Sequence, residues 1–229
     1  MGDGTETLSR RRLLAGAGAA GLLLPASGAL AAFREVTPRQ PAGPFYVPFK
    51  PLSIDNDLAV LPGRTVQGDG QLIHLVGQVL DQAERPIAAA RVEVWQANAY
   101  GRYNHPRHAN STLKLDPNFQ GFGHDRTDET GAYRFRTIKP GPYPDSPNWL
   151  RPPHVHFAVF TPKADPWTTQ MYFPGEALNE TDLLLNRVGD AVDRARLIAA
   201  VRPPAEDAEA GSVTLSFDIV LGQAGARRT

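Results

Sequence analysis

Two histidines stand one residue apart in the apolar run WLRPPHVHF, residues 149–157. Side chains of a β-strand alternate between its two faces, so we expect His154 and His156 to point one way and Val155 and Phe157 the other. Two imidazoles on one face, roughly 7 Å apart by twice the strand rise, can converge on one metal ion. A partly buried polar pair on an ordinary sheet explains the same pattern, and H-x-H alone does not decide between the two.

Tyrosine and arginine side chains lie near this pair in the sequence. Tyr143 is joined to it by a segment with five prolines from Pro142 to Pro153. Their fixed φ angles make this loop stiff, which suits holding a set of ligands in place. Arg151 precedes His154 by three residues, close enough to project into the same site. Taken alone, Tyr143 is better interpreted as a core tyrosine than as a ligand.

Composition limits the chemistry at such a site. The 229 residues contain 24 Lys plus Arg and 24 Asp plus Glu, so the formal net charge is zero. Without a basic excess, nucleic acid is not expected as a partner. There is no cysteine, so a metal must be bound by His, Asp, Glu, Tyr or backbone oxygens. Pro and Gly number 21 each, which favours turns and short strands over a helical bundle.

The N-terminal segment, residues 1–31, is typical of an export signal. Arginines at 10–12 precede an apolar segment from Leu13 to Leu24, and an A-x-A cleavage pattern follows at 29–31. The arginines after Ser9 resemble a twin-arginine signal, which is used for folded proteins. The segment is short for a membrane span, although an uncleaved anchor is the alternative. We therefore expect a periplasmic or extracellular protein that meets a membrane only during export.

Strand patterns dominate the rest of the chain. Residues 32–70 are rich in proline and predict an extended arm, followed by a catalytic domain over 71–229. Alternation predicts strands within this domain, and a stretch before Pro203 predicts one or two short helices. The fold class expected is mainly β: a β-sandwich of short strands in mixed and antiparallel pairing, with a small helical insert before the last strand. The predicted strands are 72–80, 90–97, 131–138, 154–160, 168–173 and 212–221.

Part of this pattern also fits a passive module. The segments VGQVLDQAERPIAAARVEVW and TDETGAYRFRTIKPGPY resemble the transthyretin-like sandwich modules of exported proteins. A non-catalytic module that binds metal or phenols is therefore the alternative function. Such a module does not require a tyrosine-bearing loop, NAYGRYNHP, directly after the strand that ends at Trp95.

A longer collinear set of motifs resembles the intradiol ring-cleavage dioxygenases, most closely the protocatechuate 3,4-dioxygenase type. The resemblance covers residues 41–221. The segments that carry it are VEVWQANAYGRYNHP, LDPNFQGFGHDRTDETGAYRFRTIKPGPYP, RPPHVHF, TQMYF and FDIVL. It implies a non-haem ferric ion, Fe(3+), held by two tyrosinates and two histidines. The matching positions are Tyr103, Tyr143, His154 and His156.

The resemblance also implies an activity. A small aromatic diol and O2 would react, with ring cleavage between the two hydroxylated carbons to a muconate-type diacid. Tyr143 would leave the metal and take up a substrate proton, and Arg151 would stabilise negative charge on the ring. Gln170 matches a residue that lines the pocket. A salt bridge within the loop remains the alternative for Arg151, a strand-surface amide for Gln170, and zinc for the metal.

Three further expectations concern the surroundings of the site. Trp95 is expected to pack beneath it. His105 and His108 are expected to be solvated, and contact with the ligand Tyr103 is the alternative. Asp145 replaces the aromatic residue usual after PYP in the protocatechuate enzymes, which leaves substrate identity open. Those enzymes pair two related chains, so we expect either a homo-oligomer or a pairing with a related subunit.

Overall fold

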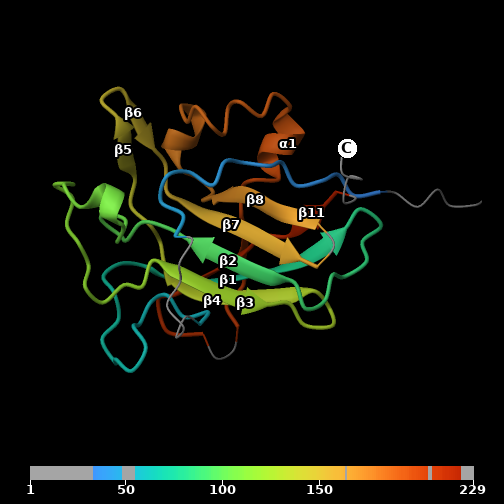
Figure 1. Ribbon diagram of the computed structural model, residues 1–229, viewed down its shortest axis with the longest axis horizontal. Coiled ribbons are helices and arrows are strands. Elements are labelled where there is room, and N and C mark those ends of the chain that lie inside the picture. The colour runs from blue at the N-terminus through green and yellow to red at the C-terminus, as the bar shows by residue number, and fades with distance from the viewer. Residues whose placement is uncertain (1–32, 48–54, 163, 206–207, 223–229) are drawn as a thin grey trace, which may run out of the picture. The chain divides into compact units, whose positions relative to one another are not determined.

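The computed structural model describes residues 33–47, 55–162, 164–205 and 208–222 (Figure 1). The predicted export signal lies outside the described residues. The described residues form a mainly β unit, as the alternating sequence patterns predicted.

One sheet is built around β1 (Leu72–Asp81). On one edge, β1 pairs antiparallel with β4 (Ala132–Ile138). It also pairs parallel with β10 (Val213–Ser216) over its first half and with β11 (Ile219–Leu221) over its second half. β9 (Ala200–Arg202) pairs antiparallel with β10. This sheet therefore combines parallel and antiparallel pairs, as expected.

The second sheet is antiparallel and has the order β3-β2-β7-β8. Its strands are β3 (Phe122–Arg126), β2 (Arg91–Trp95), β7 (His154–Thr161) and β8 (Ala164–Tyr172). Figure 1 shows these four strands side by side, with β7 and β8 next to each other.

The main hydrophobic core joins the two sheets. It takes alternate residues from several strands of both sheets, including Val92 and Val94 of β2 and Val155 and Phe157 of β7. The residues between them in sequence, such as Glu93 and His156, must point to the opposite face. That outer face of the second sheet carries a smaller cluster that contains Trp95, and there the tyrosines and histidines meet.

The sequence prediction was wrong about two segments, and it also missed the short strands β3 and β9. The predicted strand 212–221 is divided into β10 and β11, because β1 changes partner from one to the other along its length. The segment with five prolines, Pro142 to Pro153, was predicted as a stiff loop. It contains a two-stranded hairpin of β5 (Tyr143–Ser146) and β6 (Trp149–Arg151), with a bulge at Pro144/Ser146. Proline has no backbone N–H to donate. It is tolerated in an edge strand, because the backbone positions that face solvent there need no hydrogen bond to a neighbouring strand.

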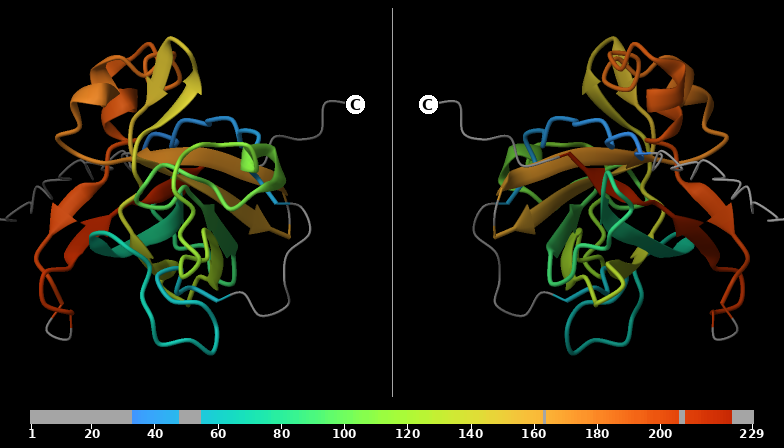
Figure 2. Two further views of the ribbon diagram at one scale, coloured as in Figure 1. Left: turned by 90° about the vertical axis from the view of Figure 1, so that its left-hand side faces the viewer. Right: turned by 90° about the vertical axis from the view of Figure 1, so that its right-hand side faces the viewer.

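The predicted small helical insert before the last strand is confirmed. Between β8 and β9 the chain forms mostly turns, with a short 3-10 helix η2 (Ala177–Glu180) and one α-helix, α1 (Ala191–Ala195). Another 3-10 helix, η1 (Pro106–His108), follows Tyr103. In both views of Figure 2 the insert, in orange, stands beside the yellow β5–β6 hairpin.

The arm, residues 33–47, runs along the second sheet as an extended segment. The Gln40 amide donates to the Thr168 carbonyl oxygen at 3.0 Å, and the Thr169 hydroxyl donates to the Pro38 carbonyl oxygen at 2.8 Å. Figure 1 shows it in blue, crossing above β8. Further along, Leu58 and Ala59 are fully buried in the main core. Among the described residues, no helix has the length and apolar character needed to cross a membrane.

Candidate metal centre

Strand register places the histidines of β7. Trp95, His156 and Gln170 form one row across β2, β7 and β8, and His154 lies opposite Tyr172 in the next row. Both imidazoles are almost fully buried. Trp95 stacks on His156 with ring centroids 5.0 Å apart and planes 7° apart, which confirms that it packs beneath the site.

The two tyrosines reach this face from separate loops. Tyr103 follows β2, and Tyr143 begins the β5–β6 hairpin, where it lies opposite Arg151. The four rings form a closed circuit. Centroid distances are 5.4 Å between the tyrosines, 5.6 Å from Tyr143 to His154, 4.8 Å between the histidines and 6.4 Å from His156 to Tyr103. The structure thus brings together all four residues predicted as metal ligands.

Burial keeps these four groups neutral. It raises the pKa of the Tyr103 hydroxyl well above its ordinary value, and the nearby Tyr143 raises it further. Burial also raises the pKa of Tyr143, although the charge of Arg151 partly offsets this. Burial and the charge of Arg151 lower the pKa of His154 well below its ordinary value and that of His156 to about 3. The site therefore offers two neutral imidazoles and two phenols.

Their polar atoms fit a cation. The Nδ1 atom of His154 lies 2.7 Å from the Pro152 carbonyl oxygen, which can only accept, so Nδ1 must carry the proton. Its Nε2 therefore presents a lone pair, 3.2 Å from Nε2 of His156. The Tyr103 hydroxyl is buried and makes no hydrogen bond among the described residues. An unpaired buried hydroxyl is costly, and a metal ion would satisfy it as a phenolate ligand.

This donor set is of mixed nitrogen and oxygen type. Among the described residues, no group of three or more His, Cys, Asp or Glu is placed to hold a metal. Two imidazoles with two anionic oxygens suit a hard trivalent ion better than zinc, whose sites use thiolate, imidazole or carboxylate.

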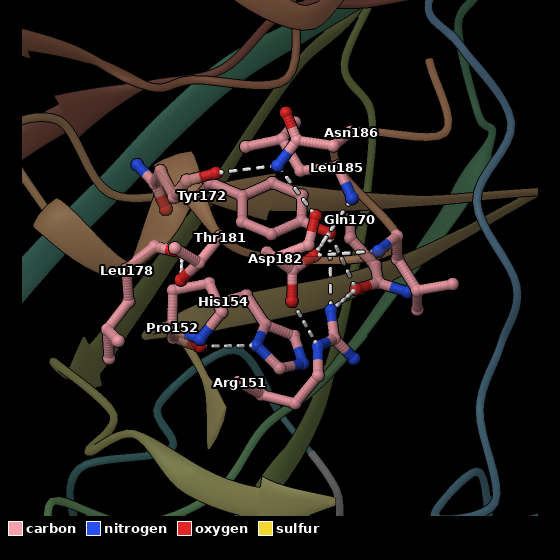
Figure 3. Close-up of polar contacts among 12 residues, drawn as sticks. Arg151, Pro152, His154, Gln170, Tyr172, Leu178, Thr181, Asp182, Leu185 and Asn186 are labelled. Atoms are coloured by element: carbon pink, nitrogen blue, oxygen red, sulfur yellow. Dashed lines mark hydrogen bonds and ion pairs between the residues drawn. The ribbon is translucent and has the colours of Figure 1, made fainter. Parts of the chain in front are cut away.

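A network of buried polar groups lies beside the metal ligands (Figure 3). Arg151 and Gln170 are 3% and 0% exposed, and Nη2 of Arg151 donates to Oε1 of Gln170 at 2.7 Å. Gln170 is therefore no strand-surface amide. Arg151 does form a salt bridge, but its partner is Asp182 in the insert and not a residue of its own loop.

The sequence prediction was incomplete for two side chains near the site, His108 and Asp182. His108, expected to be solvated, is only partly exposed, and its Nδ1 accepts a hydrogen bond from the Tyr103 amide at 3.0 Å. Asp182 was not predicted at all. Its position after β8 in a polar stretch carried no pattern that distinguished it from other surface carboxylates.

The arm roofs the site. Phe45 stacks on Tyr103 with centroids 4.2 Å apart, and the Gln170 side-chain amide donates to the Pro41 carbonyl oxygen at 2.9 Å. Tyr46 packs edge-on against Trp95 and donates to the buried Glu93 at 2.9 Å. Tyr46 is therefore a packing residue of the arm, in contact with the wall of the site.

Comparisons with known proteins give a consistent result. The model of the family described as Dioxygenase matches residues 42–223. The chain is 42% identical over 171 residues to the protocatechuate 3,4-dioxygenase beta chain of Burkholderia cepacia, covering 73% of this chain and 72% of that one. It is 30% identical over 217 residues to the catechol 1,2-dioxygenase of Acinetobacter baylyi, covering 86% of this chain and 66% of that one.

A solved structure agrees in fold. The dioxygenase domain of a dioxygenase–carbohydrate-binding protein fusion from Streptomyces sp. SirexAA-E matches with a TM-score of 0.61 and 29% identity. The match covers 82% of this chain and 99% of that domain.

Proposed function

We propose a function from the premise that this chain belongs to the intradiol ring-cleavage dioxygenase family. The protein binds Fe(3+) through Tyr103, Tyr143, His154 and His156, and it cleaves a catechol with O2. The chain is an enzyme of the catechol or protocatechuate dioxygenase class. The observation that carries the metal assignment is the closed circuit of four buried, neutral rings. The family match disfavours the alternative of a passive sandwich module.

The bound ferric ion would act as a Lewis acid that withdraws electron density from the diol ring. The protein's own groups perform the remaining tasks. The Tyr143 phenolate can accept a proton from a substrate hydroxyl, because burial favours its neutral form. The Arg151 guanidinium, fixed beside Tyr143, stabilises negative charge that develops on the ring. Phe45 of the arm, stacked on Tyr103, excludes water there, and Gln170 orients the guanidinium.

For the substrate, we propose a catechol without a carboxylate. Asp145 is exposed on β5 two residues after Tyr143, and after burial its negative charge is one of the smaller contributions to the raised pKa values of Tyr103 and Tyr143. The same charge would repel an anionic ring substituent. We expect a higher kcat/KM for catechol than for protocatechuate, and the D145N variant should narrow that ratio by a few-fold, as is typical for a solvent-screened charge. An unchanged ratio would contradict this assignment.

The first experiment is a visible spectrum of the purified chain loaded with Fe(3+). A ferric tyrosinate absorbs visible light, whereas zinc gives no colour, so the spectrum separates the two metals. Adding catechol without O2 should shift the band, and admitting O2 should yield a muconate with both atoms of O2. The paired variant Tyr103→Phe, His156→Ala should lose iron and turnover while it remains folded. Turnover equal to wild type would refute the ligand assignment.

We also propose that the chain is exported and that it assembles with copies of itself or with a related subunit. The arginine-containing segment 9–31 supports export, and the similarity to a protein named as a beta chain supports assembly. Fractionation of cells that express the full chain should place it outside the cytoplasm, and the R10K/R11K variant should retain it inside. Light scattering of the purified chain, alone and with a co-expressed related subunit, would identify the assembly.

A further inference from the structure

A buried ion pair ties Arg151 to the insert that follows β8. Nε of Arg151 donates to Oδ2 of Asp182 at 2.7 Å, and the two side chains are 3% and 0% exposed. Nη2 of the same guanidinium donates to Gln170 at 2.7 Å and to the Tyr172 hydroxyl at 3.2 Å. An unpaired cation would be very costly at this depth, so the carboxylate offsets the cost of burying the charged guanidinium.

Asp182 is itself held in one orientation. Its Oδ1 accepts hydrogen bonds from the amides of Leu185 at 2.8 Å and Leu184 at 3.1 Å, and from the Tyr172 hydroxyl at 3.2 Å. Its carbonyl oxygen accepts from the Asn186 side chain at 2.8 Å. Figure 3 shows the carboxylate between the turn and the arginine. One oxygen therefore fixes the turn and the other fixes the guanidinium.

The geometry points to Asp182 as a positioning residue for Arg151. Its carboxylate fixes Nε, while Gln170 and Tyr172 fix Nη2, so the guanidinium is held at two of its three nitrogens next to Tyr143. The inference rests on the proposed function, because it assigns a purpose to the orientation of Arg151. Asp182 acts through the arginine and is not itself a catalytic residue. The insert thus contributes the Asp182 side chain to the site.

A matched carboxylate separates positioning from simple structural support. Asp116 is also buried, and it accepts hydrogen bonds from the amides of Asp69 at 2.7 Å and Asn118 at 2.9 Å. No ion pair to arginine is found for it among the described residues. D116N and D182N therefore both replace a turn-fixing carboxylate with an amide, but only D182N withdraws a negative charge from Arg151.

The kinetic test compares these variants in two backgrounds. We expect D182N to lower kcat about 100-fold, the size of effect that a misplaced catalytic group causes. KM should change less than about threefold and the ferric tyrosinate band should be unchanged, while D116N should retain wild-type kcat. In an R151Q background D182N should add less than about twofold, since residues that act as a unit are not additive. Equal effects of D182N and D116N, or a full effect of D182N in R151Q, would overturn the inference.

A second readout does not depend on activity. In metal-free protein labelled with ¹⁵N-arginine, the Arg151 Nε–H should exchange with solvent at least about 100-fold more slowly than exposed arginines, because it is buried and bonded to a carboxylate. D182N should remove this protection and D116N should not. Persistent protection in D182N would refute positioning.

If D182N fails to fold, the R151Q/D182N double variant, which removes both charges, should recover the fold of R151Q. A wild-type chain that cleaves no catechol yet shows the protected Nε–H would refute the proposed function while it supports the ion pair.

Discussion

The buried hydroxyls of Tyr103 and Tyr133 differ in their hydrogen bonding. The Tyr103 hydroxyl makes no hydrogen bond among the described residues, whereas the Tyr133 hydroxyl donates to the Phe217 carbonyl oxygen. A buried hydroxyl without a partner costs about 1–3 kcal/mol. In the metal-free protein the Tyr103 hydroxyl should therefore lower the free energy of unfolding. A metal ion that binds its oxygen would remove this cost.

This contrast gives a prediction for two Tyr→Phe variants. Metal-free Y103F should be as stable as wild type or about 1 kcal/mol more stable, because it removes an unsatisfied group. Y133F should be about 1 kcal/mol less stable, because it removes the buried hydrogen bond from the Tyr133 hydroxyl to the Phe217 carbonyl oxygen. Urea unfolding of metal-free protein measures both. After Fe(3+) is added the order should reverse, with Y133F gaining stability and the visible band and Y103F gaining neither. A loss of metal-free stability in Y103F would show that its hydroxyl has a structural partner.

At the residue scale, a local sequence pattern predicted the two histidines but not the other residues of the site. His154 and His156 were found because period two along a strand puts them on one face. Tyr103 and Tyr143 were assigned only through the family motifs, since nothing local distinguishes a metal-binding tyrosine from a core one. Asp182 was missed because its contact with Arg151 depends on how the insert folds against the hairpin, and no pattern within either segment encodes that.

At the scale of elements, the arm packs closely against His156, one of the four predicted metal ligands. Gly43 has φ +70°, and a Cβ placed on it would lie 3.3 Å from Cε1 of His156. Trp95 donates from Nε1 to the Ala42 carbonyl oxygen at 3.2 Å, so the backbone on the arm is held against the ring that stacks on His156. The arm therefore has little freedom to retreat from an added side chain.

G43A should reduce both stability and iron affinity. A non-glycine residue in the left-handed region costs about 1–2 kcal/mol, and pressure on His156 should lower iron affinity by about tenfold, as outer-shell changes commonly do. G175A is the matched control, because Gly175 has φ +75° and nothing within 4 Å of its added Cβ. It should lose similar stability and keep wild-type iron affinity, measured by competition with a chelator. Equal iron affinities in the two variants would mean that the arm does not constrain His156.

Glu209 joins three elements at the outer face of the first sheet. Its carboxylate pairs with Arg136 of β4 at 2.8 Å and lies 2.5 Å from Nε2 of His74 on β1. The hydrogen bond from Arg136 is the main reason that the pKa of Glu209 is lowered to about 2 from its ordinary value of 4.5. A carboxylate with a depressed pKa contributes stability above its unfolded pKa and loses it as pH falls toward the folded value.

The E209Q variant tests this link. The side chain of Glu209 is 45% exposed, so solvent screening limits its contribution to roughly 0.5 kcal/mol at pH 7. The stability difference between wild type and E209Q should be full at pH 6 and should shrink between pH 4.5 and pH 2. Urea unfolding of metal-free protein at several pH values measures it. A difference that stays constant down to pH 2 would rule out the carboxylate as its source.

Elements were predicted best where alternation is regular. β1, β4 and β7 lie within a residue or two of their predicted ranges, because each alternates between a buried and an opposite face. β3 and β9 were missed, since FGHDR and AVR are short and lack a clear period. The β5–β6 hairpin was missed because its prolines argue against strand, and only its edge position makes them acceptable.

At the scale of the whole described unit, the site draws on segments that are far apart in sequence. The arm, the loop after β2, the β5–β6 hairpin and β7 each place a residue at or over the metal-binding rings. The insert reaches the same place through Asp182. A metal bound by three of these segments would therefore connect parts of the chain that are otherwise held by packing and hydrogen bonds. Because the unfolded chain has no preformed site, metal binding should stabilise the folded state.

This coupling predicts a large shift in thermal stability with iron. At a free Fe(3+) concentration about 1,000 times its Kd, binding adds about 4 kcal/mol to the free energy of unfolding, which for a unit of this size raises Tm by about 8–16 °C. Calorimetry of wild type with and without iron should show a single transition that moves by this amount, since the ligands span both the second sheet and its covering segments. The Tyr103→Phe, His156→Ala variant should show no shift, and Y133F should show the wild-type shift from a lower starting Tm. Two separate transitions in the iron-loaded protein would mean that the arm and hairpin unfold independently of the sandwich and that the metal does not join them.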